Sequence, residues 1–138
     1  MEIVAHYYID VELQGILQAM KEEHSTSVAI ADSLAMGDYA VKICENGATS
    51  IACLGVDFMV KLVEAILKRN GFPSIPMYQL QAKEIGCSLA ASAETDSYKA
   101  WLHKASQSAN TFHVIYINTS LETKGISSSI VPTITCTS

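Results

Sequence analysis

Short apolar runs alternate along the chain with longer stretches in which apolar residues recur every three or four positions. The runs predict strands at 2–6, 28–32, 50–54, 75–80, 113–118 and 133–136. The longer stretches predict helices at 10–23, 33–46, 57–70 and 94–108, and another helix start follows residue 118. This alternation favours an α/β fold, a three-layer αβα arrangement with helices on both faces of a parallel sheet.

Local signals predict where the helices begin and end and which side chains they bury. Asp10 is a typical N-cap, while Asn46-Gly47 and Gly71 are typical helix stops. The spacing within helices 10–23 and 94–108 predicts which residues point inward: Val11, Ile16, Leu17 and Met20 in the first, and Trp101 and Leu102 in the second.

Composition and charge narrow the class of protein. The chain has 138 residues, of which 49% are hydrophobic and 17% charged, which is typical of one modest globular domain with a core. A net charge of −5 without a basic run argues against a nucleic-acid partner. No apolar stretch approaches the roughly 20 residues that span a bilayer. Residues 1–8 enter a strand pattern directly, so we expect no targeting segment in this chain.

The four cysteines do not form a C-x-x-C pair or a disulfide framework. Cys44, Cys53 and Cys136 lie in apolar patterns and are interpreted as small buried residues. Cys87, in "EIGCSLAASAE", lies at or just before the start of a short helix, where the partial positive charge favours a thiolate. A thiolate there suits either a nucleophile or one ligand of a metal cluster.

An internal repeat divides the chain. "IVAHYYIDVELQG" (3–15) aligns with "HVIYINTSLETKG" (113–125), and "IADS" (30–33) aligns with "TCTS" (135–138). Val4, Glu12 and Gly15 meet identical residues in this alignment. The repeat predicts one α/β unit over residues 1–108 and the beginning of a second, cut off, over residues 109–138.

Polar side chains gather where the predicted strands end. The candidates are His6, Tyr8, Ser33, Tyr116, Asn118 and Ser138. Parallel α/β sheets bind ligands at the carboxyl ends of their strands, and helix N-termini follow directly behind. Such a surface suits a small anion that carries carboxylates or phosphate. The glycine-rich dinucleotide and P-loop motifs are absent. Alternatively, the tyrosines cover the core, and the serine and aspartate residues cap helices.

The chain resembles the quinolinate synthase family, in particular its plant-type form. The resemblance rests on six motifs in family order, which cover nearly the whole chain: "AHYYIDVELQG", "IADSLAMGDYAVK", "LGVDFM", "IGCSLA", "VIYINTSLETK" and "VPTITCTS". It implies three homologous α/β domains around a pseudo-threefold axis, of which this chain holds the first and the start of the second. Ala31, Lys61 and Ala91 depart from the residues usual in these motifs.

The resemblance also implies an activity. The family condenses iminoaspartate with dihydroxyacetone phosphate to quinolinate, the pyridine precursor of NAD, with a [4Fe–4S] cluster held by one cysteine from each domain. By motif, Cys87 is the first cluster ligand and Tyr8 assists proton transfer. The substrate contacts implied by the motifs are His6, Ser33, Tyr116, Asn118 and Ser138.

Further expectations follow from the resemblance. It allows a homodimer, and it implies a plastid location for a plant protein or a cytoplasmic one otherwise. Only one of the three cluster cysteines falls in this chain, so we expect the chain alone to be inactive. The alternative function is a non-catalytic domain of the same ancestry that binds small anions or a partner.

Overall fold

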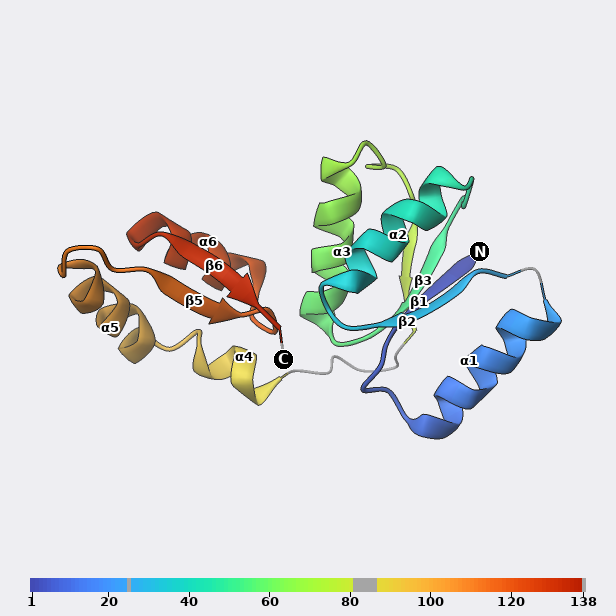
Figure 1. The fold of residues 1–138 in the computed structure, drawn as a ribbon, viewed down its shortest axis with the longest axis horizontal. Coiled ribbons are helices and arrows are strands. Elements are labelled where there is room, and N and C mark those ends of the chain that lie inside the picture. The colour runs from blue at the N-terminus through green and yellow to red at the C-terminus, as the bar shows by residue number, and fades with distance from the viewer. Residues whose placement is uncertain (25, 81–86, 138) are drawn as a thin grey trace. The chain divides into compact units, whose positions relative to one another are not determined.

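The computed structural model describes residues 1–24, 26–80 and 87–137, and it divides into two compact units. The first unit is Met1–Glu84 and the second is Ile85–Ser138 (Figure 1). The division after residue 108 that the sequence repeat predicts is a different one. It concerns the ancestry of the two repeats and not the compact units, and it stays a prediction.

The first unit contains a parallel sheet of four strands. They are β1 (Glu2–His6), β2 (Val28–Ala31), β3 (Ile51–Leu54) and β4 (Met77–Gln79), in the spatial order β2-β1-β3-β4. Every pairing in the sheet is parallel, so the carboxyl ends of the strands meet at one edge. The predicted α/β class with a parallel sheet is confirmed.

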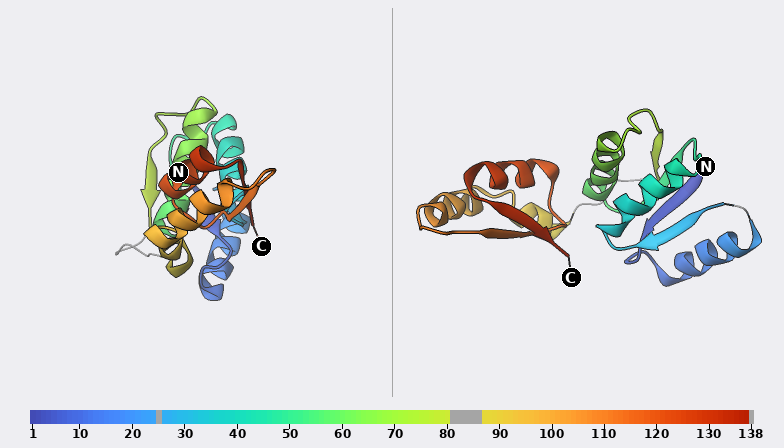
Figure 2. Two further views of the ribbon diagram at one scale, coloured as in Figure 1. Left: turned by 90° about the vertical axis from the view of Figure 1, so that its left-hand side faces the viewer. Right: turned by 45° about the horizontal axis from the view of Figure 1, so that its top comes forward.

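Helices cover both faces of this sheet, as Figure 2 shows. On one face, Leu17 of α1 (Val11–Glu23) packs into a buried cluster with Ile3, Ala5 and other strand residues. Val4 points to the opposite face, because side chains alternate along a strand, and it is completely buried. On this face α2 (Ala35–Glu45) packs against β1 and β2, and α3 (Asp57–Arg69) packs against α2 and β4. The first unit therefore has three layers.

The helix ends follow the predicted signals. Asp10 caps α1, because its carboxylate accepts the backbone N–H groups of Glu12 and Leu13. Helices α2 and α3 end just before Gly47 and Gly71, whose φ angles are +93° and +91°. Glycine adopts this left-handed conformation without steric cost, which explains why the helices stop there.

The inward face of α1 differs from the prediction. Val11 and Ile16 were expected to be buried, but 76% and 58% of their surfaces are exposed. The helix buries a narrower stripe, in which Leu13 and Met20 flank Leu17. Residues 13, 17 and 20 follow the i, i+4, i+7 spacing of one helix face, and positions 11 and 16 lie off it.

The second unit pairs two strands with three helices. Helices α4 (Ser88–Ser92) and α5 (Asp96–Ser106) precede β5 (His113–Tyr116), and α6 (Leu121–Ile130) connects it to the parallel strand β6 (Thr133–Cys136). Helices α5 and α6 contact each other, and Leu102 and Ile115 are buried in this unit. Trp101 was expected to point inward as well, but it is 56% exposed at the edge of α5.

The other face of the two-stranded sheet is largely open in this unit. Val114 and Ile134 are 53% and 52% exposed, and Cys136 is exposed beside them. The expected burial of Cys136 is therefore wrong, because no described element of the second unit covers this face. Cys53 and Cys44, in contrast, are buried as predicted. Among the described residues, no helix is long and apolar enough to cross a membrane.

Candidate functional site at the strand ends

His6 and Ser33 meet where β1 and β2 end. Both side chains are buried, and His6 Nε2 lies 3.1 Å from Ser33 Oγ. The other ring nitrogen, Nδ1, accepts the backbone N–H of Tyr8 at 3.2 Å. Nδ1 therefore carries no hydrogen, and Nε2–H donates to the serine hydroxyl. The prediction that these two residues share one edge of the sheet is confirmed.

The imidazole of His6 is held in its neutral form. Burial lowers its pKa, and the nearby Asp32 carboxylate opposes this effect only in part. Asp32 is itself engaged at the start of α2, where Oδ1 accepts the N–H groups of Leu34 and Ala35 at 2.8 and 2.9 Å. Ser33 thus lies in a fixed turn, where its hydroxyl accepts the Nε2–H of His6.

Three aromatic rings cluster at the end of β1. The ring centroids of His6 and Tyr7 are 4.9 Å apart, and that of Tyr8 lies 4.8 Å from His6 and 4.4 Å from Tyr7. Tyr8 is nevertheless 64% exposed, so its ring borders solvent beside a buried imidazole. A phenol in this position can reach a molecule bound at the strand end.

The loop after β1 is fixed by backbone and side-chain hydrogen bonds. The N–H of Tyr7 donates to the carbonyl of Ala31 at 3.0 Å, which extends the pairing of β1 with β2. The side-chain amide of Gln14, on α1, donates to the carbonyls of Tyr7 and Ile9 at 2.9 and 3.0 Å. Tyr8 lies between these two carbonyls, so its backbone is held on both sides.

The loop after β5 has the same arrangement. The N–H of Ile117 donates to the carbonyl of Cys136 at 2.7 Å. The ammonium group of Lys124, on α6, donates to the carbonyls of Ile117, at 2.7 Å, and Thr119. Ser120 caps α6, because its hydroxyl accepts the N–H of Thr123 at 3.1 Å.

The two loops correspond residue by residue. Ile3 pairs with Val28 in the first sheet, as His113 pairs with Thr133 in the second, and the following pairs stay in step. Gln14 and Lys124 occupy equivalent places, as do the caps Asp10 and Ser120. The structure therefore bears out the sequence repeat in strand register, helix cap and loop hydrogen bonds.

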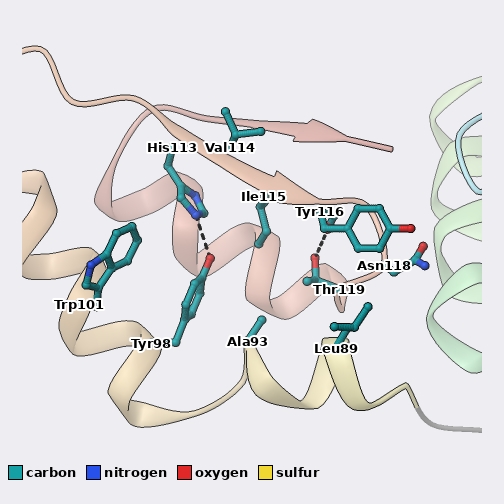
Figure 3. Close-up of a pocket in the computed structure, with 10 residues that line it drawn as sticks. All are labelled: Leu89, Ala93, Tyr98, Trp101, His113, Val114, Ile115, Tyr116, Asn118 and Thr119. Atoms are coloured by element: carbon teal, nitrogen blue, oxygen red, sulfur yellow. Dashed lines mark hydrogen bonds between the residues drawn. The ribbon is translucent and has the colours of Figure 1, made fainter. Parts of the chain in front are cut away.

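A cavity of about 350 Å³ lies in the second unit beside the end of β5 (Figure 3). Leu89 of α4 and Trp101 of α5 contribute to its lining, as do Tyr116 and Asn118. Asn118 is only 8% exposed, and Tyr116 is half-buried. These two predicted site residues therefore border one hollow within the second unit.

Two residues of this cavity, Tyr98 and His113, were not predicted as site residues from the sequence. The Tyr98 hydroxyl and His113 Nε2 lie 2.9 Å apart, and His113 Nδ1 lies 3.2 Å from the Thr133 hydroxyl. Burial lowers the pKa of His113. The repeat carried a signal for His113, since a polar residue stands there at the position of the apolar Ile3.

Cys87 lies where the sequence predicted, as the residue that precedes the short helix α4. Its side chain is half-buried and forms no disulfide. Burial and the Glu64 carboxylate raise the pKa of Cys53 to about 12, so this thiol keeps its proton. Within the described parts of the chain, no three His, Cys, Asp or Glu side chains are close enough to hold a metal ion. Ser138 lies outside the described residues.

The geometry defines a class: an α/β protein with polar side chains fixed at the carboxyl ends of parallel strands. The family model described as quinolinate synthetase A protein matches residues 1–138. The chain belongs to this family.

Plant proteins named chloroplastic quinolinate synthase are similar to the chain. It is 52% identical over 136 residues to the protein of Oryza sativa subsp. japonica. It is 48% identical over the same length to those of Arabidopsis thaliana and Nicotiana tabacum. These alignments cover 99% of the chain, which spans 19% of the length of each relative.

Proposed function

We propose that the chain forms part of a quinolinate synthase and contributes substrate contacts for the condensation of iminoaspartate with dihydroxyacetone phosphate. The observation that supports this most is the family match over residues 1–138, together with hydrogen-bonded polar strand ends at the motifs of that family. The three plant relatives carry the name of this activity. NAD biosynthesis in a plastid is accordingly the proposed setting.

The first strand end offers hydrogen bonds of defined direction to an anionic substrate. His6 donates through Nε2–H to Ser33, so the imidazole and the hydroxyl lie together, and both are proposed to contact a carboxylate or phosphate oxygen of the substrate. Because burial lowers the pKa of His6, its imidazole stays neutral above that pKa and adds no charge to the site. Tyr8, exposed beside it, is the proposed proton-transfer residue.

The second strand end offers a phenol and a carboxamide. Tyr116 and Asn118 border the cavity beside β5 and are proposed substrate contacts. The amide of Asn118 both donates and accepts hydrogen bonds, which suits a substrate that carries carboxylate and hydroxyl groups. Ser138 is proposed as a further contact from its motif alone.

The described residues fit a [4Fe–4S] cluster only in part. Cys87 is a reduced thiol at the start of a helix, as a cluster ligand should be, but no group of three ligands exists among residues 1–24, 26–80 and 87–137. We therefore propose Cys87 as one ligand of a cluster whose other ligands are not supplied by the described part of this chain.

A hybrid enzyme tests the proposal. In this hybrid, the 138 residues replace the matching stretch of the rice relative, and the purified protein is reconstituted anaerobically with iron and sulfide. Quinolinate formation from iminoaspartate and dihydroxyacetone phosphate is the expected result. A hybrid that folds and holds its cluster but makes no quinolinate would overturn the proposal and favour a non-catalytic domain that binds small anions.

A further inference from the structure

The two units use different side chains to hold the same loop. In the first, the neutral amide of Gln14 bonds the carbonyls of residues 7 and 9. In the second, the ammonium of Lys124 bonds the carbonyls of residues 117 and 119. The residue between the two carbonyls is Tyr8 in the first loop and Asn118 in the second. Tyr8 is the proposed proton-transfer residue, and Asn118 is a proposed substrate contact.

We propose that Lys124 and Gln14 are positioning residues, each of which fixes the residue bracketed by its two hydrogen bonds. This inference rests on the proposed function for its consequence in catalysis. The loop geometry itself rests only on the observed hydrogen bonds.

The geometry explains why a donor is needed at these positions. A carbonyl that is buried without a partner destabilises its conformation. In the second loop this concerns the carbonyl of Thr119 above all, because the carbonyl of Ile117 also accepts the N–H of Thr119 at 2.8 Å. Ile117 and Thr119 are buried, with 2% and 4% of their surfaces exposed. Without the side-chain donor, the loop would turn the carbonyl that has lost its partner toward water, and the residue between the two carbonyls would move with the backbone.

The surroundings of Lys124 argue against an ordinary surface lysine. It forms no ion pair with any described residue, so its hydrogen bonds go to backbone carbonyls and not to a carboxylate. Burial lowers its pKa to about 8. A lysine that served only solubility would stay fully hydrated and would keep an ordinary pKa.

The repeat supplies the conservative variant for a test. Gln14 performs the same task with a neutral amide, so Lys124→Gln should restore at least one of the two hydrogen bonds, whereas Lys124→Met removes both. Lys104→Met is the matched control, because Lys104 is exposed on α5. In the first unit, Gln14→Leu is the counterpart of Lys124→Met.

In the hybrid enzyme, Lys124→Met should lower kcat/KM at least about tenfold, mainly through a higher KM, because loss of a charge-assisted hydrogen bond weakens a positioned contact by about 1.5–3 kcal/mol. Lys124→Gln should recover most of this loss, and Lys104→Met should show none. If Lys124→Met lowers the melting temperature while the folded enzyme keeps its kcat/KM, the residue is merely structural and the proposal fails. Equal losses for Lys124→Gln and Lys124→Met also contradict it.

Amide hydrogen exchange on the 138-residue chain gives a second readout that does not depend on activity. Lys124→Met should speed exchange at residues 117–120 at least about tenfold, with the remaining amides of the second unit unchanged. Gln14→Leu should do the same at residues 7–10. Unchanged exchange in these loops would overturn the positioning role. If the unmodified hybrid is inactive but exchange changes as expected, the proposed function fails and the loop role stands.

Discussion

The segments β1–α1–β2 and β5–α6–β6 share a backbone but differ in their surroundings. Val4 and Val114 occupy the same position in the two strands, yet Val4 is fully buried and Val114 is 53% exposed. In the first unit, α2 and α3 pack over that face of the sheet. In the second, no described element of the unit covers it. The strand-end loops and their hydrogen bonds are therefore the same whether or not helices cover this face of the sheet.

The comparison also shows which features the two repeats share in their backbone and which differ in their functional groups. The helix caps and loop bonds persist although the residues change, from Asp10 to Ser120 and from Gln14 to Lys124. At the strand end itself, His6 is replaced by Tyr116, which offers a different functional group. A repeated backbone can thus present different side chains in a similar direction.

The largest effect is expected for the cysteines of the two units. In the hybrid enzyme, Cys87→Ser should abolish the cluster, because a ligand thiolate is removed. Cys53→Ser should retain it, since the Cys53 thiol is buried and protonated. Iron and sulfide content with visible absorbance near 400 nm (roughly the region of thiolate-bound clusters) measures both. The isolated 138-residue chain should hold no stoichiometric cluster, and about four irons per chain would refute this.

The difference in burial between Val4 and Val114 predicts a difference in stability. Val4→Ala should lower the free energy of unfolding of the 138-residue chain by about 1–3 kcal/mol, because each buried methyl group removed costs about 0.5–1.5 kcal/mol. Val114→Ala should change it by less than about 0.5 kcal/mol. Urea denaturation of both variants measures the contrast. Equal losses would show that Val114 is covered in solution, for example by self-association.

The two helix caps should contribute equally if the repeat preserves their role. Asp10→Ala and Ser120→Ala should each lower the stability of the variant's own unit by about 0.5–2 kcal/mol, since each leaves helix N–H groups without an acceptor. Hydrogen exchange in α1 and α6 reports each unit separately. A loss in only one unit would mean that the second loop does not depend on its cap.

The smallest predicted effect is a pH dependence of the first unit. Burial lowers the pKa of His6 in the folded state, so folding releases a proton wherever the unfolded chain still binds one. Stability from this residue is complete above about pH 6.5 and falls as the pH drops through the lowered folded value. Hydrogen exchange of the first unit at several pH values should show this loss, and His6→Asn should reduce it. His113→Asn is the counterpart for the second unit.

Much of the fold could be predicted from the sequence, because the periodicity of strands and helices, the helix caps and the helix stops depend on residues close together in the chain. The prediction of Asp10 and Gly71 as helix boundaries held for that reason. Burial was less predictable: Val11 and Cys136 are apolar, but their exposure depends on which element packs against them. A local sequence pattern does not indicate which element will pack against a given residue.

The candidate site was predictable in part. The juxtaposition of His6 and Ser33 followed from parallel strands that end at one edge. The loop bonds of Gln14 and Lys124 did not, because they join a helix side chain to backbone carbonyls and have no sequence signature. Comparison of the two repeats in space reveals them, since the same bonds recur with different donors.

If the polar strand ends act on a bound substrate, loss of the Tyr8 hydroxyl should lower the rate of the reaction itself. Kinetics of the hybrid enzyme with Tyr8→Phe should show kcat lowered by about 100-fold or more, as expected when a proton-transfer group is lost, with little change in melting temperature. Tyr78→Phe is the control, because Tyr78 is a similarly exposed tyrosine on β4 of the same unit. Equal activity of the Tyr8→Phe, Tyr78→Phe and unmodified hybrids would show that the Tyr8 hydroxyl takes no part in the reaction.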